Sequence, residues 1–181
     1  MTTERDFKPQ TSVSVERAVE LTRADLADLC DATDAAILDG NGFGWLRPPP
    51  RRKLETYWRG VLVVPERELF IGRLDAVVAA SAQLVKPTPN QESCAFAATL
   101  TTLFVAPWAR GYGLARGLLE AVERAARGHG FEVMNLDVRE TQEAAIALYE
   151  SRGYRRWGTH PSYARVDGRM IAGHYYCKRL A

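Results

Sequence analysis

Hydrophobic residues recur along the chain with two spacings, every second residue in some segments and every third or fourth in others. The first spacing predicts strands and the second predicts helices. We expect strands near residues 13–15, 69–73, 76–85, 95–105, 131–138, 154–158 and 174–180. We expect helices after Thr22, over residues 51–63, over residues 114–128 and after Gln142. Residues 1–10 are mostly polar and are expected to form a flexible leader.

Strands and helices in this order predict an α/β or α+β fold, in which helices cover both faces of a mixed sheet. The chain has 181 residues, a length that commonly forms one domain with its own hydrophobic core. No internal repeat and no linker-like segment divides the sequence. We therefore expect residues 11–181 to form a single domain.

The segment Arg110-Gly111-Tyr112-Gly113-Leu114-Ala115 lies between a predicted strand and a predicted helix. The strand is rich in β-branched and apolar residues and ends before Pro107, which cannot donate a ladder hydrogen bond. Glycine permits positive φ and the close approach of a ligand, and a helix N-terminus presents unpaired N–H groups to an anion. The segment therefore predicts a phosphate-binding turn, although a tight turn without a ligand would contain the same glycines.

Two other phosphate-binding motifs do not fit this turn. The dinucleotide fingerprint has the spacing G-x-G-x-x-G, whereas Gly111, Gly113 and Gly117 are spaced G-x-G-x-x-x-G. The nucleoside-triphosphate loop ends in Gly-Lys-Ser/Thr, whereas Gly117 is followed by two leucines. Both motifs are excluded.

A second motif follows the turn after one more predicted strand. It reads Gln142-x-x-Ala145-x-x-Leu148-Tyr149-x-x-x-Gly153-Tyr154. Together, the two motifs resemble the signature of the GNAT superfamily of acyl-CoA-dependent N-acyltransferases. The core phosphate motif of that family is Gln/Arg-x-x-Gly-x-Gly/Ala, and Arg110, Gly113 and Ala115 occupy its defined positions. The family usually has asparagine where this chain has Gln142, and the resemblance covers residues 100–158.

The resemblance implies a fold, a cofactor and a set of binding residues. It implies a central mixed, mostly antiparallel sheet that splays after the strand ending at Val105, and a gap that takes the pantetheine arm of acetyl-CoA. The residues implied to bind this cofactor are Leu103, Val105, Arg110, Gly111, Tyr112, Gly113, Leu114, Ala115 and Gln142. We expect acetyl-CoA to be the acyl donor, and we expect no metal.

The resemblance also implies a catalytic role for Tyr149, which would protonate the departing thiolate of coenzyme A. The alternative is that Tyr149 only packs in the core. The backbone N–H of Val105 would stabilise the oxyanion of the tetrahedral intermediate. No cysteine falls inside the two motifs, so the implied reaction is direct acetyl transfer to a primary amine of a small molecule or peptide in a ternary complex.

The sequence does not single out a general base. Many members of the family carry a carboxylate on the strand before the phosphate turn, whereas residues 97–102 carry none. The candidates elsewhere are Glu92, Asp137, His160 and His174. The missing carboxylate favours an alternative function, a non-catalytic acyl-CoA-binding protein of the same fold.

Three aromatic residues lie in the part of the chain that, by the resemblance, covers the acceptor pocket. They are Trp45, Tyr57 and Trp58. The helical spacing of Tyr57 and Trp58 favours core packing over ligand contact. The acceptor is therefore left open.

The composition narrows the choice of partners and compartment. The chain has 24 basic and 22 acidic residues and a net charge of +2, which gives no support for a nucleic-acid-binding face. No apolar segment approaches the length of about 20 residues that crosses a bilayer. Cys30, Cys94 and Cys177 lack the spacing of zinc or redox motifs, and a sparse, odd set fits a reducing compartment. We expect a cytoplasmic protein with neither a nucleic acid nor a membrane as partner, and a homodimer is left open.

Overall fold

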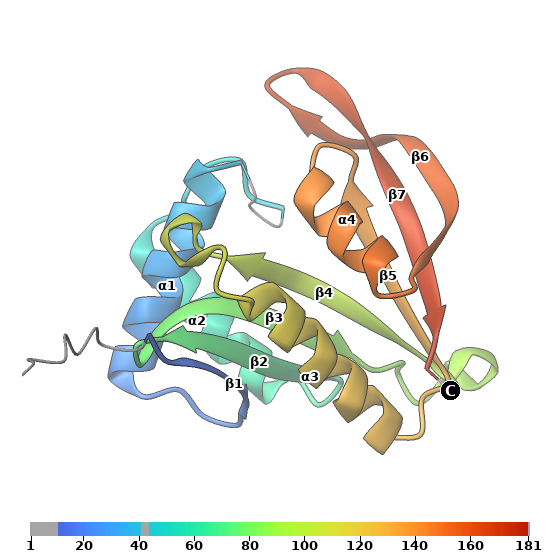
Figure 1. Cartoon of the computed structure of the whole chain (residues 1–181), viewed down its shortest axis with the longest axis horizontal. Coiled ribbons are helices and arrows are strands. Elements are labelled where there is room, and N and C mark those ends of the chain that lie inside the picture. Colours follow the sequence, from blue (N-terminus) through green and yellow to red (C-terminus); the bar gives the residue numbers. More distant parts are fainter. Residues whose placement is uncertain (1–10, 41–43, 181) are drawn as a thin grey trace, which may run out of the picture.

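Figure 1 shows the computed structural model of the chain, in which one twisted sheet carries helices on both faces. The structure describes residues 11–40 and 44–180, so the leader expected at residues 1–10 lies outside the described residues. The strands are β1 (Val13–Ala18), β2 (Arg67–Leu74), β3 (Val77–Val85), β4 (Ala97–Val105), β5 (Val133–Arg139), β6 (Arg155–Val166) and β7 (Arg169–Arg179). The helices are α1 (Arg23–Leu38), α2 (Arg51–Val63), α3 (Leu114–Gly128) and α4 (Glu143–Ser151).

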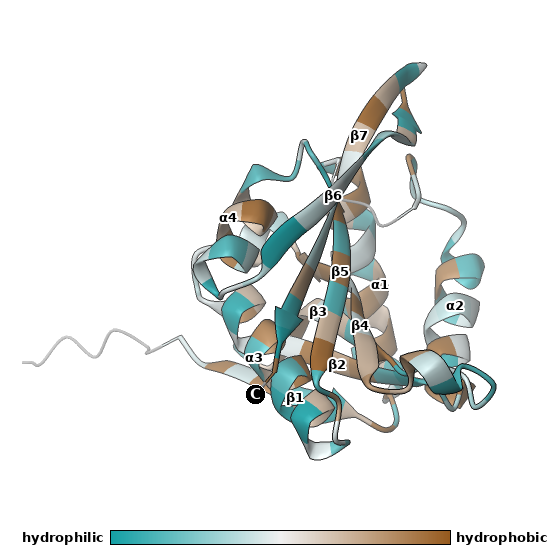
Figure 2. Cartoon of the chain, turned by 90° about the vertical axis from the view of Figure 1, so that its right-hand side faces the viewer, coloured by the Kyte–Doolittle hydropathy of each residue, from teal (hydrophilic) through white to brown (hydrophobic). Residues whose placement is uncertain are grey.

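The seven strands form one sheet in the order β1-β2-β3-β4-β5-β7-β6. Neighbouring strands are antiparallel except β4 and β5, which are parallel. Helix α3 packs against β1 to β4 on one face, and α1 and α2 cover the other face. Figure 2 shows hydrophobic residues concentrated on the strands between these helices. This mixed, mostly antiparallel sheet with helices on both faces confirms the expected fold.

Strands β4 and β5 separate soon after they pair. Their parallel pairing is limited to residues 97–99 of β4 and 133–135 of β5. Beyond Thr99, the edge of β4 that faces β5 has no strand partner, which confirms the expected splay. A β-bulge lies at this level, where the register with β3 shifts and Thr102 has a φ of +57°. Bulges bend the strand that carries them, which favours the divergence.

Helix α1 begins where the sequence predicts. Thr22 accepts a hydrogen bond from the Asp25 N–H (3.1 Å), and the Asp25 carboxylate accepts one from the Thr22 N–H (3.2 Å). This is a capping box, which pairs N–H groups that the helix leaves unbonded. Asp25 also pairs with Arg73 of β2 (2.6 Å), and the hydrogen bond from Arg73 lowers the pKa of Asp25. The cap therefore also ties α1 to the sheet.

Strands β6 and β7 are longer than the sequence predicts. The expected strands covered residues 154–158 and 174–180, whereas the hairpin spans residues 155–166 and 169–179. Most of β6 is exposed, so its side chains lack the alternating burial by which a strand is recognised. Asp167 and Gly168 form the turn with φ of +47° and +77°, a geometry typical of Asp-Gly hairpins.

The two halves of the sheet are fixed to each other at the end where β4 and β5 pair. The Lys178 ammonium of β7 donates to both carboxylate oxygens of Glu123 in α3, at 2.7 and 2.8 Å, and Glu123 is buried. Arg127 of α3 donates to the Leu180 carbonyl (2.7 Å). Since a buried charge left without its partner is strongly destabilising, these contacts hold the closed end of the split.

The turn between β2 and β3 stores backbone strain at Ala76. Asp75 and Ala76 have φ of +48° and +71°, and Ala76 is exposed. A Cβ in the left-handed region is unfavourable, so we expect Ala76→Gly to raise the free energy of unfolding by about 0.5–1 kcal/mol in urea denaturation. Ala35→Gly, inside α1, is the control and should lower it by a similar amount. A loss of stability in Ala76→Gly would contradict this account.

Candidate active site

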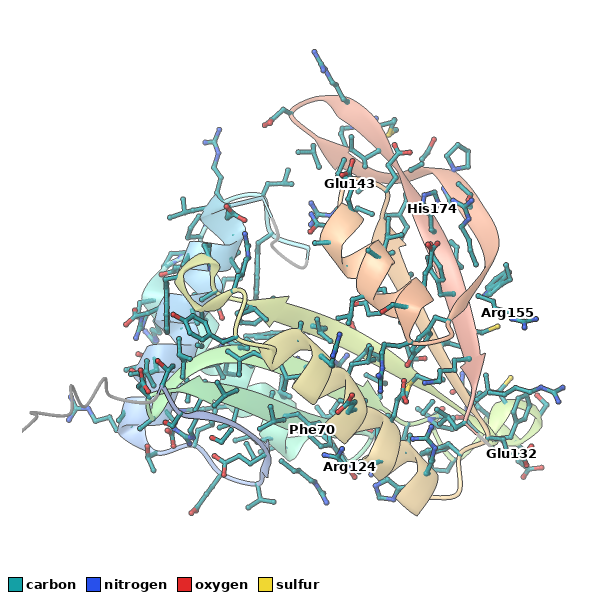
Figure 3. All side chains as sticks on the ribbon, in the orientation of Figure 1. Phe70, Arg124, Glu132, Glu143, Arg155 and His174 are labelled. Carbon is teal, nitrogen blue, oxygen red and sulfur yellow. The ribbon has the colours of Figure 1, made fainter. Side chains whose placement is uncertain are left out.

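A cavity of about 1290 Å³ opens where β4 and β5 separate. The split is open at the end where α4 begins, near Glu143, and closed at the end where β5 begins, near Glu132 (Figure 3). Residues from both faces of the sheet line the cavity, since Leu114 belongs to the core on the α3 side and Tyr57 lies on α2. The cavity therefore passes through the plane of the sheet. The candidate residues that line it are Leu103, Val105, Arg110, Gly111, Gly113, Leu114, Ala115, Gln142 and Tyr149.

The turn before α3 presents backbone N–H groups to the cavity. Gly111 and Gly113 both have a φ of +85°, and Gly113 is the N-cap of α3. The Gly117 N–H donates to the Gly113 carbonyl (3.0 Å), so the N–H groups of residues 114–116 precede the helical ladder. A Cβ added at either turn glycine would meet no described atom within 4 Å. The turn is an open cradle at the positive end of the helix dipole. Tyr112 is half exposed in this turn and does not line the cavity.

Two polar side chains at the rim of the cavity contact the end of α1. The Arg110 guanidinium pairs with the Asp39 carboxylate (2.6 Å), and the Gln142 amide donates to the Gly40 carbonyl (3.3 Å). Gln142 is the N-cap of α4 and makes no side-chain capping bond there. The end of α1 is thus held from both sides of the cavity, by the turn before α3 and by α4.

The backbone of β4 faces the cavity where it has no partner strand. The Ala106 N–H donates to the Ala79 carbonyl of β3 (2.8 Å). Since N–H groups alternate in direction along a strand, the Val105 N–H points the other way, towards the cavity. This edge can pair with an extended ligand as it would with another strand.

Tyr149 reaches the cavity from α4 and is 5% exposed. Its ring packs against those of Tyr154 and Tyr176, with centroids 5.8 and 6.5 Å away. Burial raises the pKa of the Tyr149 hydroxyl well above its ordinary value, and the charge of Asp137 adds to the shift. A hydroxyl in this environment keeps its proton at neutral pH and can donate it to a leaving group.

A carboxylate lies in the cavity, on a strand other than the one before the turn. Asp137 of β5 lines the cavity and accepts a hydrogen bond from the Tyr163 hydroxyl of β6. Burial, together with this hydrogen bond, raises the pKa of Tyr163, so its hydroxyl stays a donor. The other candidate bases, Glu92, His160 and His174, are not among the described residues that line the cavity.

The cavity contains residues that sequence reasoning missed. They are Arg67, Arg139, Tyr163 and Arg165. Trp58 is fully buried, as helical spacing predicts, whereas Tyr57 is only partly buried and lines the cavity. Tyr163 lies where the β6 register shifts, and its ring packs so closely on Gly173 that any Cβ there would overlap it. Gly173 is therefore the one sequence signal of this packing.

Other kinds of site have no support in the part of the chain that the structure describes. There, no group of three or more His, Cys, Asp or Glu side chains could hold a metal ion. No helix among the same residues combines the length and the apolar character needed to cross a membrane. None of the three cysteines lines the cavity, and burial raises the pKa of the Cys30 thiol to about 11.

Comparison with known proteins identifies the family. Residues 31–154 match a family model described as the acetyltransferase (GNAT) family. A protein of Azospirillum brasilense, described as an uncharacterized N-acetyltransferase in the hisH-hisA intergenic region, is 65% identical over 132 residues, which are 73% of this chain and 79% of that protein. The N-alpha-acetyltransferase RimI of Mycobacterium tuberculosis is 42% identical over 67 residues, which are 37% of this chain and 40% of RimI.

Solved structures share the fold at low sequence identity. An N-acetyltransferase from Staphylococcus aureus Mu50 superposes with a TM-score of 0.80 at 16% identity, covering 94% of this chain and 99% of that one. The protein yncA from Salmonella typhimurium, solved with its cofactor acetyl-CoA, gives a TM-score of 0.76 at 19% identity, covering 93% and 94%. These structures support the fold, and the family model spans more than half of the sequence. The chain therefore belongs to the GNAT family of acetyltransferases.

Proposed function

We propose that the protein transfers an acetyl group from acetyl-CoA to a primary amine of a small molecule or peptide, directly in a ternary complex. One observation carries the proposal. A single cavity crosses the sheet, so that the turn before α3 and Tyr149 open onto the same space as Asp137. A donor bound from one face and an acceptor bound from the other would meet in that cavity.

The residues at the turn fit the phosphates of acetyl-CoA. The positive φ values of Gly111 and Gly113 open the cradle, and the first N–H groups of α3 point into it. Arg110 and Arg116 would add positive charge at its rim. The unpaired edge of β4, including the Val105 N–H, would bind the extended arm, and Gln142 would contact it from α4.

Asp137 and Tyr149 would move the protons of the reaction. When bound, acetyl-CoA supplies the activated thioester. Asp137 would accept a proton from the acceptor amine, while Tyr163 fixes the carboxylate by its hydrogen bond. Tyr149 would donate its proton to the departing sulfur, and the Val105 N–H would stabilise negative charge on the carbonyl oxygen.

Direct transfer, without an acetylated enzyme, is supported by the positions of the cysteines. None of them lines the cavity, and Cys30 is fully buried. The alternative of a non-catalytic acyl-CoA-binding protein was based on the absence of a carboxylate from β4. Asp137 supplies a carboxylate from β5, so we favour an enzyme.

The proposal is tested first by the binding of acetyl-CoA. Gly113→Ala places a Cβ in the cradle at a φ of +85°. Gly130, beyond the other end of α3, has a φ of +82° and equally open surroundings, so Gly130→Ala controls for the backbone strain. We expect both variants to lose similar stability, and only Gly113→Ala to lose acetyl-CoA affinity, by about tenfold or more in calorimetry.

The second test is turnover. Thiol release from acetyl-CoA is measured across a panel of primary amines, and at least one amine should be acetylated. Equal acetyl-CoA affinity in the two glycine variants would contradict the proposed phosphate site. Binding of acetyl-CoA without turnover of any amine would favour the non-catalytic alternative.

A further inference from the structure

The cavity is lined by far more positive than negative charge. The charged residues among its described lining are Arg67, Arg110, Arg116, Asp137, Arg139 and Arg165. Five cations thus accompany one carboxylate, although the whole chain has a net charge of only +2. A cleft with an excess of one sign of charge concentrates ligands of the opposite sign.

The proposed cofactor accounts for only part of this charge. Arg110 and Arg116 flank the turn before α3, where the phosphates of acetyl-CoA would bind. The other three arginines come from β2, β5 and β6. Their charge needs another explanation, and the alternation of side chains along two of these strands gives it.

Arg67 and Arg139 lie on the face of the sheet opposite α3. On β2, Leu69 and Ile71 pack with α1 and α2, so Arg67, two residues before Leu69, faces the same helices. On β5, Val138 packs in the core on the α3 side, so Arg139 faces the other way, as Asp137 does. This is the face from which the acceptor would enter under the proposed function.

Arg67 is held in position by neutral groups. Its guanidinium donates to the Gln83 side-chain oxygen (2.6 Å), and the Gln83 amide nitrogen donates to the Tyr57 hydroxyl (3.1 Å). Gln83 is fully buried, which fixes this row of side chains between β2, β3 and α2. Among the described residues, Arg67 has no carboxylate partner. A guanidinium held in this way retains donors for a carboxylate or phosphate.

We infer that the acceptor carries an anionic group, a carboxylate or a phosphorus oxyanion, besides its amine, and that Arg67 binds this group. The inference rests on the proposed function, because it concerns the acceptor of the same cavity. Free amino acids and aminoalkylphosphonates carry both groups in one molecule. At a peptide N-terminus, the neighbouring carboxyl is a neutral amide. The acceptor class is therefore a small anionic amine.

The test compares matched acceptors. Each L-amino acid is paired with its carboxamide, and each aminoalkylphosphonate with the alkylamine of the same length, and thiol release from acetyl-CoA is measured. In the wild type, the anionic member of an accepted pair should have a kcat/KM about tenfold or more above its neutral analogue. The carboxylate and phosphonate series distinguish the two sources of the anion.

Variants of Arg67 then assign the binding of the anion to this side chain. Arg67→Gln should lower kcat/KM for the anionic acceptor by about 10- to 100-fold, and leave the neutral analogue and the KM for acetyl-CoA unchanged. Arg67→Lys should recover part of the loss, since it keeps the charge but not the planar fork. Arg59→Gln, exposed on α2 and outside the cavity lining, is the control and should behave as wild type.

Each outcome decides the inference. Equal use of anionic and neutral acceptors, or equal losses in Arg67→Gln, would overturn it and leave the proposed function standing. If no acceptor releases thiol, the melting temperature of the protein saturated with coenzyme A is measured with the same pairs. Anionic members that raise it in wild type and not in Arg67→Gln support the inference, and no rise with any of them overturns it. If acetyl-CoA fails to bind, the proposed function falls and the inference falls with it.

Discussion

Tyr149→Phe is expected to lower the rate of acetyl transfer by about 10²–10⁴-fold, the usual contribution of a positioned acid. The substitution removes only the hydroxyl, so the ring should keep its packing against Tyr154 and Tyr176 and the protein its stability. Acetyl-CoA affinity should not change, because the hydroxyl acts on the leaving sulfur. Single-turnover measurements separate this chemical step from product release.

Tyr154→Phe is the matched control for this prediction. Tyr154 is also buried, its ring lies 5.8 Å from that of Tyr149, and it does not line the cavity. Its substitution should leave the rate within a few-fold of wild type. Similar losses in both variants would mean that Tyr149 acts through packing.

The raised pKa of Tyr149 also fixes a pH dependence. Burial disfavours the charged phenolate, so the hydroxyl loses its proton only above the ordinary tyrosine value of about 10. The wild-type rate should therefore show no fall between about pH 7 and pH 9 from ionisation of this group. A fall in that range that disappears in Tyr149→Phe would contradict its role as the acid.

The turn before α3 was predictable because its chemistry is local. A strand, two glycines and a helix follow one another along the chain, and no distant residue is needed to place Gly111, Gly113 and the first N–H groups of α3. The same holds for the capping box at Thr22 and Asp25. Such features depend on backbone geometry over a few residues, which sequence spacing encodes directly.

The acceptor side was less predictable because it is assembled across the sheet. Asp137 and Tyr163 are far apart in sequence and meet through the pairing of β5, β7 and β6. Tyr163 lies at a register shift in a mostly exposed strand, so no periodic pattern marks it. The Asp167-Gly168 turn was a local signal for the longer hairpin, and the sequence analysis did not use it.

Asp137→Asn is expected to lower kcat/KM at neutral pH by about 10²–10⁴-fold, because an amide cannot accept the proton of the acceptor amine. The asparagine oxygen can still accept the hydrogen bond from Tyr163, so the geometry of β5 and β6 should be kept. The residual reaction would depend on amine that is already neutral. Its rate should therefore rise more steeply with pH than that of the wild type, and most steeply for amines of high pKa.

Glu132→Gln provides the control for the loss of one negative charge. Glu132 is exposed at the closed end of the split, where β5 begins, and does not line the cavity (Figure 3). Its substitution should change neither the rate nor the pH profile. Acetyl-CoA affinity measured by calorimetry should be the same in both variants and the wild type, because neither side chain lies at the turn before α3. A wild-type rate and pH profile in Asp137→Asn would show that the proton leaves the amine by another route, such as a chain of water molecules, and would leave Asp137 as a residue that only positions Tyr163.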